Sequence, residues 1–220
     1  MQKEESFSFL DLPVAILRAK WGSVSKNGVA SFLGNGIAIT TKEGVSLNKE
    51  KPEEIILAFP KNDGGELKFK AICREEPLVD PQIEALDIFE NDQDLGSLLG
   101  NFGCTHLEIW EKHWKKEKLY IAGFSAKNSI MAEALDPKLL PDGFLEYETR
   151  LGNGQVGNPL IFKTHPADQM WTLLGIHAFY KNGKGFGWPI TLGVSDQLSW
   201  SAVAVGKIWQ KQIKRLEEKG

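Results

Sequence analysis

The sequence has few cysteines and few histidines for its 220 residues. The two cysteines, Cys73 and Cys104, lie too far apart to form a C-x-x-C pair, and the four histidines show no ligand spacing. These absences argue against a disulfide framework and against a zinc site. We therefore expect neither a metal nor another cofactor, and a reducing, cytoplasmic compartment fits the cysteine usage best.

The chain also lacks long apolar runs and a strong net charge. No segment approaches the roughly 18 consecutive apolar residues that a membrane helix needs. Residues 1–10 contain no apolar core of signal-peptide length. The net charge is −3, and a weakly acidic chain is a poor generic binder of nucleic acid or anionic membranes. We expect no membrane segment.

Glycine is frequent instead, with 22 residues spaced between short apolar runs. This rhythm predicts about a dozen short β-strands joined by turns, with a bridge near Gly96–Gly103 between an earlier and a later set. His106–Trp110 is among the predicted strands, and Asn27-Gly28 and Asn182-Gly183 are predicted turns. The pattern fits two antiparallel barrels, and a single large sandwich has the same local signature.

One long helical pattern ends the sequence. A stripe of apolar residues recurs every three or four positions and predicts a helix with one buried face: Leu198, Ala202, Val205, Trp209, Ile213 and Leu216. Ser195 is the predicted N-cap of this helix. The predicted domains are an N-terminal β-barrel over residues 1–98, a C-terminal β-barrel over residues 99–196 and a C-terminal helix over residues 197–220 that packs on the barrels.

The most informative motif is Gly154-Gln155-Val156-Gly157, followed about twenty residues later by Gly175-Ile176-His177 and a glycine-rich hairpin. This combination resembles the 3C-like cysteine proteases of picornaviruses and potyviruses. The resemblance implies a mainly β, chymotrypsin-like double antiparallel β-barrel with a C-terminal helix. Glycines beside Gln155 and Val156 permit a tight turn whose backbone N–H groups form an oxyanion hole.

The catalytic residues of that family are not found at the matching positions. The resemblance places Val156 at the nucleophile, Glu43 at the general base and Glu84 at the acid. All four histidines lie at position 106 or later, so the predicted first barrel has none. Nucleophilic catalysis needs an activatable atom with a base in hydrogen-bond reach, so these positions are expected to be vestigial. A displaced nucleophile at Cys104 is the less favoured alternative.

The substrate pocket of the family has two counterparts in this sequence. His177 matches the histidine that recognises a substrate glutamine, and the alternative is a core histidine on an apolar strand. Leu151 stands where the family has a pocket threonine, which argues against recognition of glutamine. An apolar or amphipathic side chain is expected to suit this pocket better.

Three functions remain open from the sequence. The first is a pseudoprotease that serves as a protein-binding or assembly module, from a viral polyprotein, with a protein or peptide as partner. The second is an active 3C-like cysteine protease whose nucleophile has been substituted at Val156. The third is an RNA-binding domain that uses Glu111–Lys118, where basic residues flank a tryptophan, although an exposed hairpin is the simpler interpretation of that segment.

Overall fold

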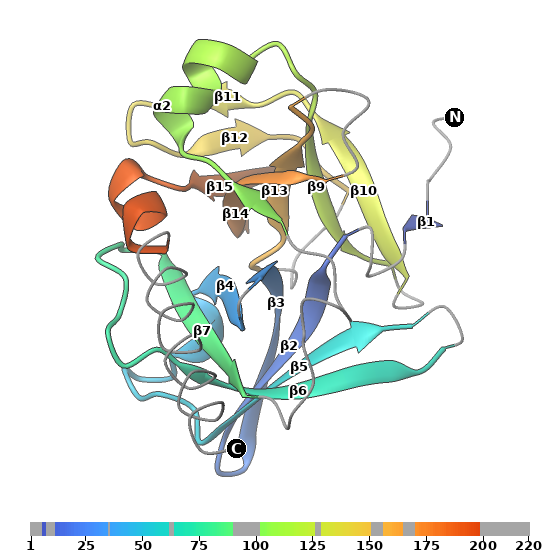
Figure 1. Ribbon diagram of the computed structural model, residues 1–220, viewed down its shortest axis with the longest axis vertical. Helices are drawn as coiled ribbons and strands as arrows, with labels where there is room; N and C mark the ends of the chain where they lie inside the picture. Colours follow the sequence, from blue (N-terminus) through green and yellow to red (C-terminus); the bar gives the residue numbers. More distant parts are fainter. Residues whose placement is uncertain are drawn as a thin grey trace, which may run out of the picture.

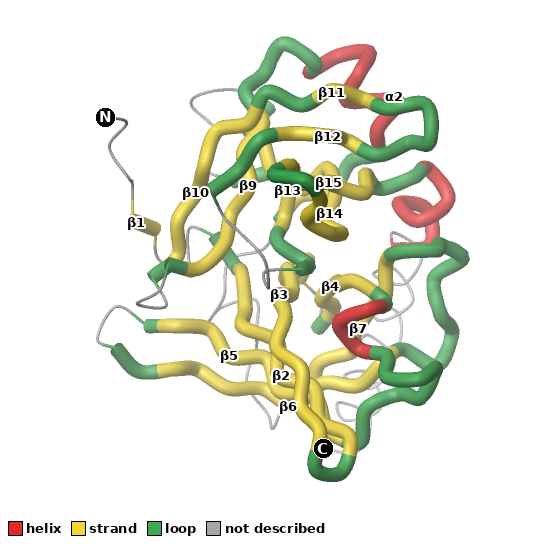
Figure 2. Tube along the Cα trace, turned by 180° about the vertical axis from the view of Figure 1, so that it is seen from behind, coloured by secondary structure: helices red, strands yellow, loops and turns green. Residues whose placement is uncertain are grey.

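The computed structural model describes residues 6–7, 12–34, 36–61, 64–89, 102–125, 129–150, 156–164 and 170–198. Two β-sheet bodies lie one above the other, with the earlier part of the chain in the lower body (Figure 1). Seen from behind, strands dominate both bodies and the described helices are short (Figure 2). This architecture confirms the predicted mainly β, double-barrel fold.

The first barrel is a closed sheet of six antiparallel strands in the order β2-β3-β4-β7-β6-β5. The strands are β2 (Val14–Trp21), β3 (Val24–Gly34), β4 (Ile37–Thr41), β5 (Glu54–Pro60), β6 (Glu66–Cys73) and β7 (Ile83–Phe89). Small alanines such as Ala30 and Ala38 alternate with large residues such as Leu57 and Phe59 in its interior. This mixture fills the tapering space inside a small barrel.

The second barrel contains the remaining strands. They are β1 (Ser6–Phe7), β8 (Gly103–Cys104), β9 (Leu119–Phe124), β10 (Ile130–Leu135), β11 (Lys138–Leu139), β12 (Leu145–Tyr147), β13 (Pro159–Phe162), β14 (Thr172–Lys181) and β15 (Lys184–Pro189). They follow the order β1-β10-β9-β13-β14-β15-β12-β11, and β8 pairs with β14 in parallel. Large apolar side chains fill the interior of this barrel.

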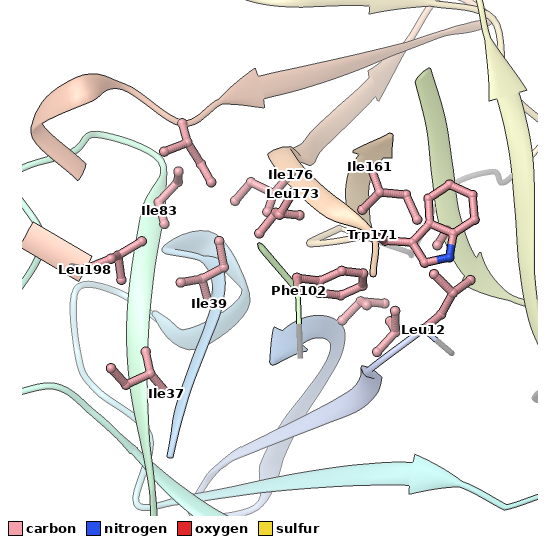
Figure 3. Close-up of a cluster of buried hydrophobic side chains, with 14 of the residues drawn as sticks. Leu12, Ile37, Ile39, Ile83, Phe102, Ile161, Trp171, Leu173, Ile176 and Leu198 are labelled. Atoms are coloured by element: carbon pink, nitrogen blue, oxygen red, sulfur yellow. The ribbon is translucent and has the colours of Figure 1, made fainter. Parts of the chain in front are cut away.

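An apolar core joins the two barrels. Side chains from β4 and β7 of the first barrel meet side chains from β13 and β14 of the second (Figure 3). Ile37, Ile39 and Ile83 are at most 3% exposed although they lie outside the first barrel's own interior. Strand β4 is therefore buried on both faces, which explains its nearly continuous apolar sequence.

One of the two predicted turns is wrong and the other is confirmed. Asn27-Gly28 lies inside β3, and the chain reverses instead at Gly22, which has a φ of 54°. A Cβ added to Gly28 would lie 3.4 Å from the carbonyl oxygen of Val156, so this part of β3 runs beside the Val156–Gly157 turn. The predicted turn at Asn182-Gly183 is confirmed.

The segment that follows β8 is helical, whereas the sequence predicted a strand and a hairpin. It forms α2 (Leu107–Ile109) and the π-helical turn η2 (Trp110–Trp114). Trp110 is 4% exposed and packs into the core of the second barrel, and Trp114 lies against Phe162 with ring centroids 5.7 Å apart. Because residues four apart share one face of a helix, the helical conformation lets both indoles pack on the second barrel.

The predicted C-terminal helix begins earlier than expected. Residues 192–198 are helical, so Ser195 lies inside the helix. Thr191 takes the capping role, because its Oγ1 accepts a hydrogen bond from the Val194 amide at 3.4 Å. Leu198 is 6% exposed in the inter-barrel core, while the rest of the predicted apolar stripe lies outside the described residues. Within the described chain, no helix is long and apolar enough to cross a membrane.

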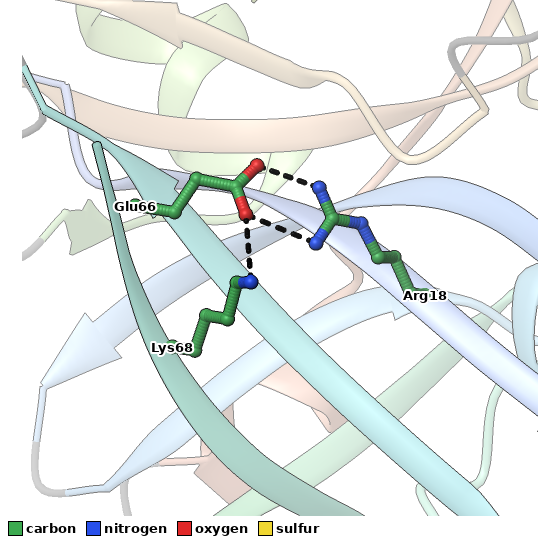
Figure 4. A network of polar contacts seen from close by, with 3 residues as sticks. All are labelled: Arg18, Glu66 and Lys68. Atoms are coloured by element: carbon green, nitrogen blue, oxygen red, sulfur yellow. Dashed lines mark hydrogen bonds and ion pairs between the residues drawn. The ribbon is translucent and has the colours of Figure 1, made fainter. Parts of the chain in front are cut away.

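A polar network lies on the outside of the first barrel. Arg18 of β2 makes two hydrogen bonds of 2.6 and 3.0 Å to the carboxylate of Glu66, and Lys68 approaches the same carboxylate at 3.3 Å (Figure 4). The hydrogen bonds from Arg18 lower the pKa of Glu66. Because the side chains are partly exposed, solvent screening limits the pair to about 1 kcal/mol of stability at most.

Candidate functional site

The end of the predicted turn lies in the seam between the barrels. The Val29 amide in β3 donates a hydrogen bond to the carbonyl oxygen of Val156 at 3.0 Å. The Gly157 amide donates to the carbonyl oxygen of His177 at 2.8 Å, and the His177 amide donates to the carbonyl oxygen of Asn158 at 2.7 Å. The described end of the turn therefore bonds to both barrels through its backbone groups.

Gly157 is required by this geometry. Its φ is 98°, a region that side chains with a Cβ rarely adopt. An added Cβ would lie 2.1 Å from the carbonyl oxygen of Val29 and 3.1 Å from Oγ1 of Thr40. The sequence predicted a glycine-dependent turn, and the structure adds the reason for the second glycine. Gly154, Gln155 and Leu151 lie outside the described residues, so the oxyanion-hole geometry and the pocket role of Leu151 remain predictions.

The end of β4, where the family has its catalytic histidine, reaches the same seam. Thr40 donates a hydrogen bond to the Val29 carbonyl at 2.7 Å, and that carbonyl faces Gly157. Glu43 follows β4 and opens the short helix η1 (Glu43–Val45), where its side chain is exposed. Thr41 Oγ1 accepts a hydrogen bond from the backbone amide of residue 44 at 3.1 Å, which holds this helix against β4.

Glu84, which the resemblance places at the acid position, is buried in β7. It shares a face of β7 with Leu86 and Ile88, which belong to the interior of the first barrel, while Ile83 belongs to the inter-barrel core. Glu84 is 8% exposed, and its Oε1 atom has no hydrogen-bond partner within the described structure. Burial raises the pKa of this carboxyl group. Burial, with a smaller contribution from the Glu84 carboxylate, raises the pKa of Cys73 to about 11.

His177 is buried and bonded to a tyrosine. Its Nδ1 lies 2.7 Å from the hydroxyl oxygen of Tyr147, and the two residues are 1% and 2% exposed. Burial lowers the pKa of His177 to about 4 and raises that of Tyr147. The contact therefore joins a neutral imidazole to a neutral phenol at pH 7. The sequence did not predict the role of Tyr147, although the residue lies just before the turn motif.

The glycine-rich hairpin makes room for this pair. A Cβ added to Gly185 would lie 2.6 Å from Cε2 of Tyr147 and 3.1 Å from Cε1 of His177. A Cβ added to Gly187 would lie 3.1 Å from Cε1 of the same tyrosine. The glycines of β15 thus leave room for the ring of Tyr147 against the strand. The glycine-rich sequence of the hairpin was the signal from which a bulky neighbouring side chain could have been predicted.

The remaining candidate side chains do not gather at the turn. Cys104 is exposed in β8 and pairs with Leu173, whereas the turn bonds to His177 further along β14. No group of three or more histidine, cysteine, aspartate or glutamate side chains in the described residues could hold a metal ion. The site therefore consists of a backbone turn, a buried histidine–tyrosine pair and the end of β4.

Neither a family model nor a curated protein sequence matches the chain. Solved structures do match it. The protease Anisep from Arthrobacter nicotinovorans aligns with a TM-score of 0.69 at 10% identity, over 91% of this chain and 100% of that one. A thermostable serine protease, AL20, from an extremophilic microorganism aligns at 0.64 and 9% identity, over 86% and 96%. The serine protease of a human pathogenic astrovirus aligns at 0.56 and 13% identity, over 85% and 94%.

These similarities establish the fold. The chain has the chymotrypsin-like double β-barrel, and the three solved structures reported above are named as proteases, two of them as serine proteases. At identities of 9–13% the comparison extends to the fold alone.

Proposed function

We propose that the chain is a catalytically inactive 3C-like protease homologue that serves as a protein-binding or assembly module. The observation that carries the proposal is the combination of Val156 at the turn with a first barrel that contains no histidine. The resemblance to the 3C-like family further favours an origin in a viral polyprotein and a place in the host-cell cytoplasm.

Chemistry at the seam supports an inactive site. Valine has no atom that can be activated for attack, so a carboxylate such as that of Glu43 would have no nucleophile to deprotonate at position 156. Glu84 is a carboxylate like Glu43, so it offers no imidazole that could take a proton at the turn. Loss of both nucleophile and base typically costs on the order of a million-fold in turnover.

The retained backbone favours binding by strand addition. Strand β13 covers one edge of β14 over Thr172–Ile176, and the turn bonds to His177 on that edge. Beyond this point the described residues place no strand against that edge of residues 178–181. An extended peptide could pair there through main-chain hydrogen bonds without any catalytic residue. The neighbouring pocket would then take an apolar or amphipathic side chain.

A cleavage assay tests the inactivity. The purified protein should not cleave a peptide library that includes Gln-Gly junctions. A Val156→Cys variant should also be inactive, because no imidazole is present to take the thiol proton. Combining Val156→Cys with Glu43→His is the informative comparison. Turnover by the parent that a single substitution in the seam abolishes would contradict the proposal.

Peptide selection tests the binding. Extended peptides selected on the parent protein should lose affinity when alternate backbone nitrogens are methylated, because strand addition uses alternate N–H groups. The same peptides should slow amide exchange in residues 178–181. Uniform tolerance of N-methylation, or protection confined to the outside of the first barrel, would refute strand addition at β14.

A further inference from the structure

The second barrel is held together differently from the first. The path of its described strands ends at β1 and β11, whereas the first barrel closes completely. Strand β12 pairs with β11, which follows β10 after two residues, so an opening is left beside β10 where it is not paired with β12. A groove of about 690 Å³ lies at this opening, lined by side chains that include Glu133, Glu146, Arg150 and Lys184. Most of these side chains are charged, so the opening is bridged by polar groups.

Glu133 spans the opening. Its position in β10 is fixed by pairing with Ile121 of β9. Its Oε2 atom accepts a hydrogen bond of 2.8 Å from the hydroxyl of Thr149 and one of 2.9 Å from the amide of Arg150. Hydrogen bonds to a carboxylate are stronger than those between neutral groups, so this one side chain can tie the chain after β12 to β10.

The chain tied by Glu133 is the one that leads to the turn. Tyr147, at the end of β12, bonds to His177, and the segment then reaches Val156 and Gly157, which bond to Val29 and to the same histidine. Glu133 therefore anchors the entry of a connection whose exit is anchored in the seam. If one end of a connection is released, the connection gains conformational freedom, and the hydrogen bonds at its other end open more often.

We propose that Glu133 is a positioning residue for the peptide-binding surface. It acts through Thr149 and Arg150 to hold the start of the segment that ends in the Val156–Gly157 turn. This inference rests on the proposed binding function for its effect on affinity, but its structural part is independent of that function. No catalytic role is involved, because the carboxylate is committed to its two hydrogen bonds.

The test compares three variants of the whole chain by amide exchange and peptide affinity. Glu133→Ala removes the acceptor and should speed exchange of the Arg150 and Gly157 amides about tenfold, with a similar loss of affinity for a peptide selected on the parent. Glu133→Gln keeps a carbonyl acceptor and should restore both values to within about threefold. Glu146→Gln, which removes an ion pair with Lys184 in the same groove, should leave both unchanged.

The exchange result separates this inference from the proposed function. If the parent binds no peptide, faster exchange at Arg150 and Gly157 in Glu133→Ala, with rescue in Glu133→Gln, still supports the positioning role. Unchanged exchange at Gly157 in Glu133→Ala would overturn it. Equal acceleration of amides throughout both barrels would also overturn it, because that pattern reports general destabilisation.

Discussion

Substitution of Gly157 by alanine tests whether the turn is clamped between the barrels. The added Cβ would lie 2.1 Å from the Val29 carbonyl oxygen, so the turn must move away from β3. That movement breaks or stretches the Val29–Val156 and Gly157–His177 backbone hydrogen bonds, at about 1 kcal/mol each. The positive φ adds about 1–2 kcal/mol for any residue with a Cβ. We expect Gly157→Ala to lower the free energy of unfolding by about 3–4 kcal/mol.

Gly183→Ala is the matched control. Gly183 has a φ of 82°, close to that of Gly157, but no heavy atom lies within 4 Å of its added Cβ. It therefore carries the cost of the backbone conformation without the steric clash, about 1–2 kcal/mol. The difference between the two variants isolates the contact with Val29 and should be about 2 kcal/mol.

Urea unfolding followed by tryptophan fluorescence measures both variants, because the chain contains seven tryptophans. A difference of about 2 kcal/mol corresponds to roughly a thirtyfold change in the unfolding equilibrium. If Gly157→Ala and Gly183→Ala agree within about 0.5 kcal/mol, the turn does not press on β3 and the described anchoring is wrong.

Four further substitutions address charge and the inter-barrel contact. Burial raises the pKa of Glu84, so its neutral carboxyl favours folding at low pH, and this contribution is lost as the pH rises through the raised pKa. Glu84→Gln should therefore raise the free energy of unfolding by about 1 kcal/mol near pH 7 and leave it unchanged near pH 4. The hydrogen bonds from Arg18 lower the pKa of Glu66, so Glu66→Gln should lower the free energy of unfolding by about 0.5 kcal/mol near pH 7 and by progressively less as the pH falls through the lowered pKa. Urea titrations at several pH values measure both glutamate variants, and their pH trends should be opposite. Asp80 accepts hydrogen bonds from two backbone amides and, at 3.1 Å, from Nε1 of Trp188 in the other barrel. Asp80→Ala removes all three and should lower the free energy of unfolding by about 2–3 kcal/mol, whereas Trp188→Phe removes one and should lower it by about 1 kcal/mol. Equal losses in thermal unfolding would contradict this assignment of the hydrogen bonds.

Local patterns in the sequence were sufficient for a mainly β chain of many short strands, whereas the choice of two barrels over one sandwich came from the resemblance. Short apolar runs between glycines predicted the strands of both barrels, because alternation of buried and exposed side chains is a property of each strand alone. They were not sufficient where local and tertiary preferences differ. Asn27-Gly28 has the composition of a tight turn, but pairing along the whole of β2 places it in mid-strand.

The helical segment after β8 shows the same limit. Leu107, Trp110 and Trp114 are spaced by three and four residues, which is a helical period that the strand prediction overlooked. The segment is so short that its apolar spacing fits either a strand or a helix. Only the contacts of Trp110 and Trp114 with the second barrel distinguish the two.

The sequence alone determined that Val156 stands in a glycine-flanked motif and that no histidine precedes residue 106, because these are statements about composition and position. Only the tertiary structure decided which groups meet there. Gly157 faces Val29 from more than a hundred residues away, Tyr147 of β12 meets His177 of β14 across the intervening strand β15, and Glu133 bonds to residues that follow β12. Such contacts depend on the relative placement of strands distant in the chain, which local periodicity does not specify.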